Sequence, residues 1–71
     1  MTRQEFMNGY SPQHRMMVTY TDLKDGSTRK GIALQEPIPS LSGIHIVYVD
    51  SFANAVKVTQ IHKVENTGKL W

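Results

Sequence analysis

The stretch RMMVTYTDLKDGSTRKGIALQ, residues 15–35, decides the fold of this 71-residue chain. Apolar and polar residues alternate at its start, a pattern of half-buried strands that places on one face Met16, Val18 and Tyr20. Asp25-Gly26 favours a tight hairpin turn, because such a turn needs a residue with positive φ. We therefore predict a β-hairpin whose second strand covers residues 27–35, with Ile32 and Leu34 pointing inward.

A second apolar segment, IHIVYV at residues 44–49, gives the strongest strand signal in the chain. Both of its faces are largely apolar, which is typical of a strand that is covered on two sides. Tyr48 falls on the phase that we predict to face the core, as Tyr20 does in the first strand. Residues 36–43 contain two prolines, which lack the N–H group of a regular ladder, and we predict a loop there.

The segment that follows predicts three short elements. Residues 55–59 alternate with Val56 and Val58 inward, which indicates a fourth strand. Residues 60–63 predict a single helical turn, and a last short strand begins at Val64. Short strands that are separated by tight turns favour a small barrel.

The two ends of the chain differ from this barrel. Residues 2–9 predict a short helix, because Thr2 and Glu5 have the spacing of a capping box. Residues 66–71 are mostly polar, and we expect them to form a flexible tail. The sequence thus predicts one domain over residues 1–71, with the barrel at residues 15–65.

The length and composition of the chain limit the kinds of partner that we expect. A domain of this size buries a small core and usually depends on a staple, a metal, a partner or self-association. The sequence has no cysteine, so disulfides are excluded, and it has no apolar run near the ~20 residues of a membrane span. We expect a cytoplasmic protein, without a membrane, that binds another protein or forms a homo-oligomer. The net charge of +2 is too modest to identify the partner.

The order of elements resembles that of SH3-like and Sm-like small barrels, and it comes nearest to the WYL-type domains of bacterial regulators. The resemblance covers residues 16–65 and rests on Val18-Thr19-Tyr20, Asp25-Gly26, Arg29-Lys30, Pro37, Gly43, Ile46-Val47-Tyr48 and residues 58–65. It implies a mainly β fold, a single SH3-like/Sm-like barrel of about five strands with a short N-terminal helix and a one-turn helix before the last strand.

The same resemblance implies a function, the sensing of nucleic acid or a nucleotide-like ligand through basic groups. Two positions depart from the family. Ile46-Val47-Tyr48 stands where the family has its namesake Trp-Tyr-Leu, and Gln60 stands where such domains usually carry an arginine.

No residue pattern predicts catalysis, a metal site or a cofactor. The three histidines, His14, His45 and His62, lie outside any nucleophile motif and lack the short paired spacing of metal ligands. The aspartates lie in or beside turns, where such side chains cap backbone amides. We therefore expect a protein that is not an enzyme.

Two kinds of binding surface remain. Basic residues offer candidate nucleic-acid contacts at Lys24, Arg29, Lys30, Lys57 and Lys63, provided that they lie on one face. Apolar residues in loops offer candidate protein contacts at Ile38, Leu41, Phe52 and Tyr10.

We favour the second kind, because the best aromatic residues are predicted to point inward. The expected function is a non-catalytic protein-interaction module, or a small modulator or inhibitor of a partner protein. Chains of this size are common among phage and mobile-element accessory proteins. The alternative is a nucleic-acid-binding accessory factor of the Sm-like or WYL-like type.

Overall fold

The computed structural model describes residues 1–71 as a mainly β domain. The elements, in chain order, are α1 (Arg3–Gly9), β1 (His14–Thr21), β2 (Thr28–Ala33), β3 (Ile38–Pro39), β4 (His45–Tyr48), β5 (Ala55–Lys57), the 3₁₀ turn η1 (Val58–Gln60) and β6 (Ile61–Leu70). None of the helical segments has the length and apolar character that crossing a membrane requires.

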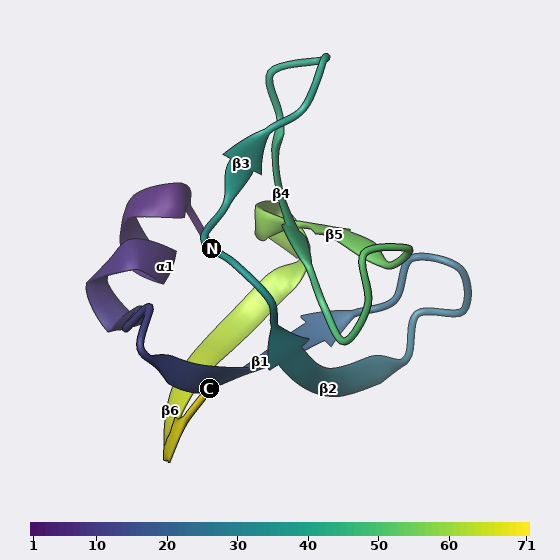
Figure 1. Ribbon diagram of the computed structural model, residues 1–71. Coiled ribbons are helices and arrows are strands. Elements are labelled where there is room, and N and C mark those ends of the chain that lie inside the picture. The colour runs from purple at the N-terminus through teal and green to yellow at the C-terminus, as the bar shows by residue number, and fades with distance from the viewer.

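The strands form two antiparallel three-stranded sheets rather than one closed barrel. Sheet A has the order β2-β1-β6, and sheet B has the order β3-β4-β5. A single bridge, between Ala33 and Val49, links the end of β2 to the end of β4. Figure 1 shows that the β3–β4 hairpin projects away from the rest of the molecule, and that α1 and the β1–β2 turn lie at opposite sides.

The predicted N-terminal helix is confirmed, together with its capping box. The Thr2 hydroxyl accepts from the Glu5 backbone N–H at 3.2 Å, and a Glu5 carboxylate oxygen accepts from the Thr2 N–H at 2.9 Å. Phe6 is fully buried, so this short helix is held by the core rather than by its own propensity.

The predicted hairpin is also confirmed, but the inward phase of its second strand is wrong. Gly26 adopts φ 72°, as the turn requires. In β2 the buried residues are Gly31 and Ala33, whereas Ile32 and Leu34 are only half-buried. The reason is the close approach of sheet B. A Cβ atom at Gly31 would lie 2.5 Å from Cγ1 of Val49, so only glycine fits there without a shift of its neighbours.

Sheet B corrects two further predictions. Ile38–Pro39, expected in a loop, forms a two-residue edge strand, β3, where proline is tolerated because one side of the ladder is open. In β4 the buried residue is Val47, and Tyr48, predicted to be a core residue, lies half-buried on the opposite face. Because both faces of β4 are apolar, the alternation of residues does not determine which face is buried.

The C-terminal third begins its last strand earlier and extends it further than predicted. Val56 and Val58 are buried as predicted, but the helical turn covers Val58–Gln60 rather than residues 60–63. β6 begins at Ile61, which pairs with Tyr20 of β1 and whose side chain is fully buried in the core. Residues 66–70, for which the sequence predicts a flexible tail, continue β6 beside the start of β1.

The core lies between the two sheets and under α1. It consists of ten buried residues, namely Phe6, Met16, Val18, Tyr20, Ala33, Val47, Val49, Val56, Val58 and Ile61. Side chains from α1, from every strand except β3 and from η1 meet there, so the core fixes which face of each sheet remains outside.

Candidate functional site

The outer face of sheet B is largely apolar. Ile38 of β3 pairs with Ile46 of β4, and Tyr48 pairs with Ala55 of β5. Directly paired residues project to the same side of a sheet, and residues two apart on a strand share that side. The inward neighbours on these strands face the core, so Ile38, Ile46 and Tyr48 face away from it.

Two exposed side chains extend this surface. Leu41, in the β3–β4 turn, is fully exposed, and the Phe52 side chain is 67% exposed. The rings of Phe52 and Tyr48 lie in a tilted stack with centroids 5.4 Å apart. We refer to this set, Ile38, Leu41, Ile46, Tyr48 and Phe52, as the sheet B face.

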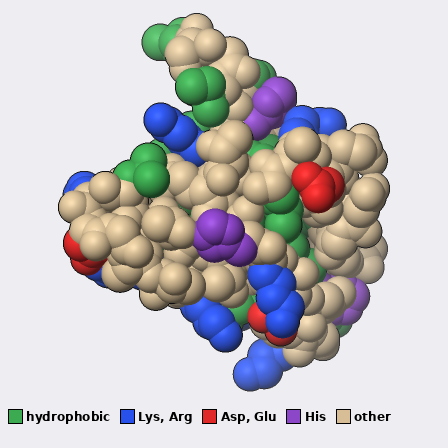
Figure 2. Space-filling model, turned by 180° about the vertical axis from the view of Figure 1, so that it is seen from behind, with side chains coloured by type: hydrophobic (Ala, Val, Ile, Leu, Met, Phe, Trp, Pro, Cys, Tyr) green, Lys and Arg blue, Asp and Glu red, His purple; other side chains and the backbone are tan.

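The sheet B face includes a shallow groove of about 650 Å³ along the projecting hairpin. Its walls come from β3, from the β3–β4 turn and from Ile46 and Tyr48 of β4. Figure 2 shows hydrophobic side chains gathered on this hairpin, where it stands clear of the rest of the molecule. A partner therefore has access to the hairpin from more than one side.

Charge on the sheet B face is sparse. Lys57 pairs with Ile46 across the sheet and is its one charged side chain from a strand. The nearest acid along the chain, Asp50, is engaged elsewhere, because its carboxylate accepts from the Ile32 N–H at 2.8 Å. The sheet B face is thus apolar with a positive edge.

Three of the four predicted protein-binding residues come together in this face. Ile38 and Leu41 line the groove, and Phe52 joins it through Tyr48. The fourth, Tyr10, lies elsewhere, with its ring centroid 5.7 Å from that of Phe6. Sequence reasoning missed Ile46 and Tyr48 as contact residues, because the two apolar faces of residues 44–49 predicted a strand that is covered on both sides.

The five predicted nucleic-acid contacts do not form one stripe. Lys57 belongs to sheet B, whereas Lys30 and Lys63 flank Thr19 across sheet A. Arg29 pairs with Tyr20, one position out of phase with Lys30, and Lys24 lies in the β1–β2 turn. Figure 2 shows Lys and Arg in separate places over the face that it draws.

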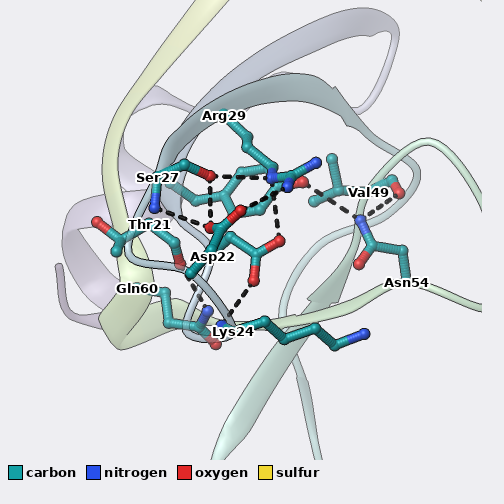
Figure 3. Close-up of polar contacts among 10 residues, drawn as sticks. Thr21, Asp22, Lys24, Ser27, Arg29, Val49, Asn54 and Gln60 are labelled. Atoms are coloured by element: carbon teal, nitrogen blue, oxygen red, sulfur yellow. Dashed lines mark hydrogen bonds and ion pairs between the residues drawn. The ribbon is translucent and has the colours of Figure 1, made fainter.

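Arg29 is neutralised by the turn that precedes it. Its guanidinium contacts Asp22 at 3.0 Å and Asp25 at 3.1 Å (Figure 3). The Ser27 hydroxyl and backbone N–H, with a smaller contribution from Arg29, lower the pKa of the Asp25 carboxyl to about 2. Arg29 therefore already has two carboxylate partners in the hairpin turn.

Gln60 links the two sheets at one end of the molecule. Its amide oxygen accepts from the Lys57 N–H at 2.9 Å, and its amide nitrogen donates to the Thr21 carbonyl at 2.8 Å. Figure 3 shows Gln60 reaching from η1 to the end of β1. At this position of the chain the side chain completes backbone hydrogen bonds instead of carrying the positive charge that the WYL resemblance implies.

The histidines lie in different environments. Nδ1 of His14 lies 2.8 Å from the Ser11 hydroxyl, and Nε2 of His62 contacts the Thr21 hydroxyl. His45 lies on β4, and no group of three or more His, Asp or Glu side chains converges in the structure.

Neither a protein-family model, nor a curated protein, nor a solved structure matches this chain.

Proposed function

We propose that the domain is a non-catalytic protein-interaction module that binds another polypeptide through the sheet B face. The observation that supports this most directly is the convergence of exposed and half-buried apolar side chains on one face. A contiguous exposed apolar patch is typical of interaction sites, because leaving it in water is unfavourable. Aromatic anchors such as Tyr48 and Phe52 commonly dominate the binding energy of interfaces.

The charge of the sheet B face favours one chemical class of partner. Its strands carry Lys57 and no acid that is free of an intramolecular contact. We infer that the partner presents an apolar segment accompanied by carboxylates, because opposite charges at the edge of an interface favour association. Two copies of this face would instead bring Lys57 side chains toward each other.

We also propose that the two sheets are the halves of an open SH3-like/Sm-like small barrel. The arrangement in favour of this is a pair of three-stranded antiparallel sheets across one core, with a 3₁₀ turn before the last strand. Such folds host many functions, so the proposed activity rests on the sheet B face and not on the fold.

The experiment uses a double variant and a matched control. Leu41→Ser with Phe52→Ser removes two exposed anchors, whereas Leu23→Ser removes another exposed leucine, from the β1–β2 turn, whose exposure of 65% is close to that of Phe52. Proteins retained on the immobilised domain from a lysate of its source cells are quantified by mass spectrometry for each form. We expect a partner that wild type and Leu23→Ser retain equally and that the double variant loses.

The purified partner then allows the loss of binding affinity to be measured. We expect titration calorimetry to show binding at least about tenfold weaker for the double variant, as for the loss of interface anchors. Equal binding by all three forms contradicts the proposal. Sedimentation equilibrium of the wild type alone tests whether a second copy of this chain binds to the sheet B face. A dimer that the double variant abolishes would make the partner a second copy of this chain.

Binding of nucleic acid is the second candidate function, and one observation favours it. Lys30 and Lys63 flank Thr19 on the outer face of sheet A, although Lys63 also contacts Glu65 at 3.6 Å. Fluorescence anisotropy with labelled DNA and RNA tests it at low and near-physiological salt. Binding that weakens steeply with salt, and that is lost in Lys30→Ala/Lys63→Ala but not in Lys24→Ala/Lys57→Ala, supports this candidate. Absence of binding at low salt rejects it.

A further inference from the structure

A second groove, of about 430 Å³, lies apart from the sheet B face. It is formed by the end of α1, the segment before β1, the segment after β2 and the last residue. Its walls combine apolar, aromatic and acidic side chains from Met7, Tyr10, Pro12, Leu34, Glu36 and Trp71. None of these residues belongs to the sheet B face, so an inference about this groove does not depend on the proposed function.

Glu36 gives the groove a negative charge that the protein does not compensate. It is the one carboxylate side chain with neither a hydrogen bond nor an ion pair, since partners are present for Glu5, Asp22, Asp25, Asp50 and Glu65. The negative charge of Glu36 also acts on the side chain of Tyr10. Burial, and then the charge of Glu36, raise the pKa of the Tyr10 hydroxyl.

The two aromatic rings of the groove are held in place by other contacts. Tyr10 lies against the buried Phe6, with ring centroids 5.7 Å apart. The backbone N–H of Trp71 donates to the Gln13 carbonyl at 3.4 Å, and the Arg15 guanidinium lies 5.5 Å from the Trp71 ring centroid. Arg15 is not among the residues that line the groove. The groove therefore presents positioned rings whose faces attract cations.

We propose that this groove binds a lysine side chain from another polypeptide. The four methylenes of lysine match the apolar wall of Met7, Pro12 and Leu34. The ammonium group then meets the Glu36 carboxylate and the rings of Tyr10 and Trp71. Lysine fits better than a bare cation, because its apolar stem is buried while its compact charged end remains near the carboxylate.

The test uses Trp71 as the reporter, since it is the only tryptophan in the sequence. The probe is the peptide acetyl-Gly-Lys-Gly-amide, titrated into the full chain while the tryptophan fluorescence and the indole N–H signal in NMR spectra are followed. Peptides with norleucine or acetyl-lysine in place of lysine keep the stem and remove the charge. We expect saturable binding of the lysine peptide, and at least about threefold weaker binding of the two neutral peptides.

Variants separate the groove from non-specific attraction. Glu36→Gln should weaken binding of the lysine peptide at least about threefold, because it removes the charge that faces the ammonium. Glu65→Gln is the matched control, since that carboxylate already has Lys63 as partner, and should bind like wild type. Tyr10→Phe keeps the ring and should bind within about twofold of wild type.

Two results would overturn the proposal. Equal binding of the lysine and norleucine peptides would show that charge is not recognised, and unchanged binding in Glu36→Gln would show the same for the carboxylate. Free n-butylammonium is titrated as a third probe, because it has the charged end of lysine without a polypeptide. If it bound more tightly than the lysine peptide, the site would take a small amine rather than a side chain of a polypeptide.

Discussion

The two sheets share one core but differ in length and in outer face. Sheet A has strands of 8, 6 and 10 residues, and its outer face carries Thr19 between two lysines. Sheet B has strands of 2, 4 and 3 residues, and its outer face is apolar. The outer face of sheet A is mixed, because it also carries the half-buried pair Met17 and Ile32. The outer face of sheet B is almost entirely apolar, and the exposed side chains of Leu41 and Phe52 extend it. This difference is the observation on which the proposed protein contact at sheet B rests.

The largest expected effect compares two phenylalanines. Phe6 is fully buried in the shared core, and Phe52 is mostly exposed on the sheet B face. Phe6→Ala should lower the free energy of unfolding by about 3–5 kcal/mol, enough to unfold much of a domain this small. Phe52→Ala should lower it by less than about 1 kcal/mol, through loss of the stack with Tyr48. Urea denaturation followed by Trp71 fluorescence measures both, and equal losses would show that Phe52 belongs to the core.

The second largest effect on stability is expected at Gly31, where the two sheets meet. Gly31→Ala places a Cβ against Val49 and Asp50, and it should cost about 1–3 kcal/mol of stability, because the packed contact has little room to adjust. Gly9→Ala is the matched control. A Cβ there meets its nearest atoms at 3.9 Å and favours the helix, so stability should not fall. Thermal unfolding by circular dichroism distinguishes the two, and a stable Gly31→Ala would show that the sheets separate more easily than described.

Gln60 tests how tightly the two sheets are held at the other end. Gln60→Leu removes the acceptor for the Lys57 N–H and the donor to the Thr21 carbonyl, and it should cost about 1–2 kcal/mol. The exposed neighbour Thr59→Ala should stay within about 0.5 kcal/mol of wild type. Hydrogen exchange of the Lys57 amide should become faster in Gln60→Leu only. Unchanged exchange would mean that the link contributes nothing.

The smallest effect concerns the polar turn of sheet A at acid pH. The pKa of Asp25 is about 2 in the folded protein, below its ordinary value of 3.8. Between these values the unfolded chain binds more protons, so stability falls as pH is lowered from about 4 to about 2. In Asp25→Asn, and in part in Ser27→Ala, this fall should be shallower. Urea midpoints measured at several pH values across this range provide the check, and parallel curves for all three forms would refute the assignment.

Local signals in the sequence predicted the elements that depend on a few neighbouring residues. Thr2 and Glu5 identified the helix, and Asp25-Gly26 identified the hairpin, because capping and turn geometry are fixed within a few residues. The candidate protein contacts Ile38, Leu41 and Phe52 were predicted from apolar residues in expected loops. Their meeting on one face depended on the pairing of β3 with β4, which two prolines had argued against.

The errors share a physical cause, since each depends on a contact between segments far apart in the chain. Gly31 faces the core because Val49 approaches it, which hydrophobic alternation in β2 does not report. Tyr48 faces outward because the smaller Val47 and Val56 fit between the sheets. Residues 66–70 form a strand because the beginning of β1 offers them a partner. None of these contacts leaves a mark on the local pattern of residues.

The central position of β1 sets the order in which the domain is able to fold. Val18 pairs with Gly31 on one side, a neighbour through one turn, and with Val64 on the other, after most of the chain has intervened. The hairpin is thus available early, whereas β6 arrives only after a long loop has closed. Until Ile61 and the residues after it have been synthesised, β1 exposes one unpaired edge, the kind of edge at which nascent chains associate wrongly. Pairing of the long last strand with β1 therefore completes sheet A and removes this unpaired edge.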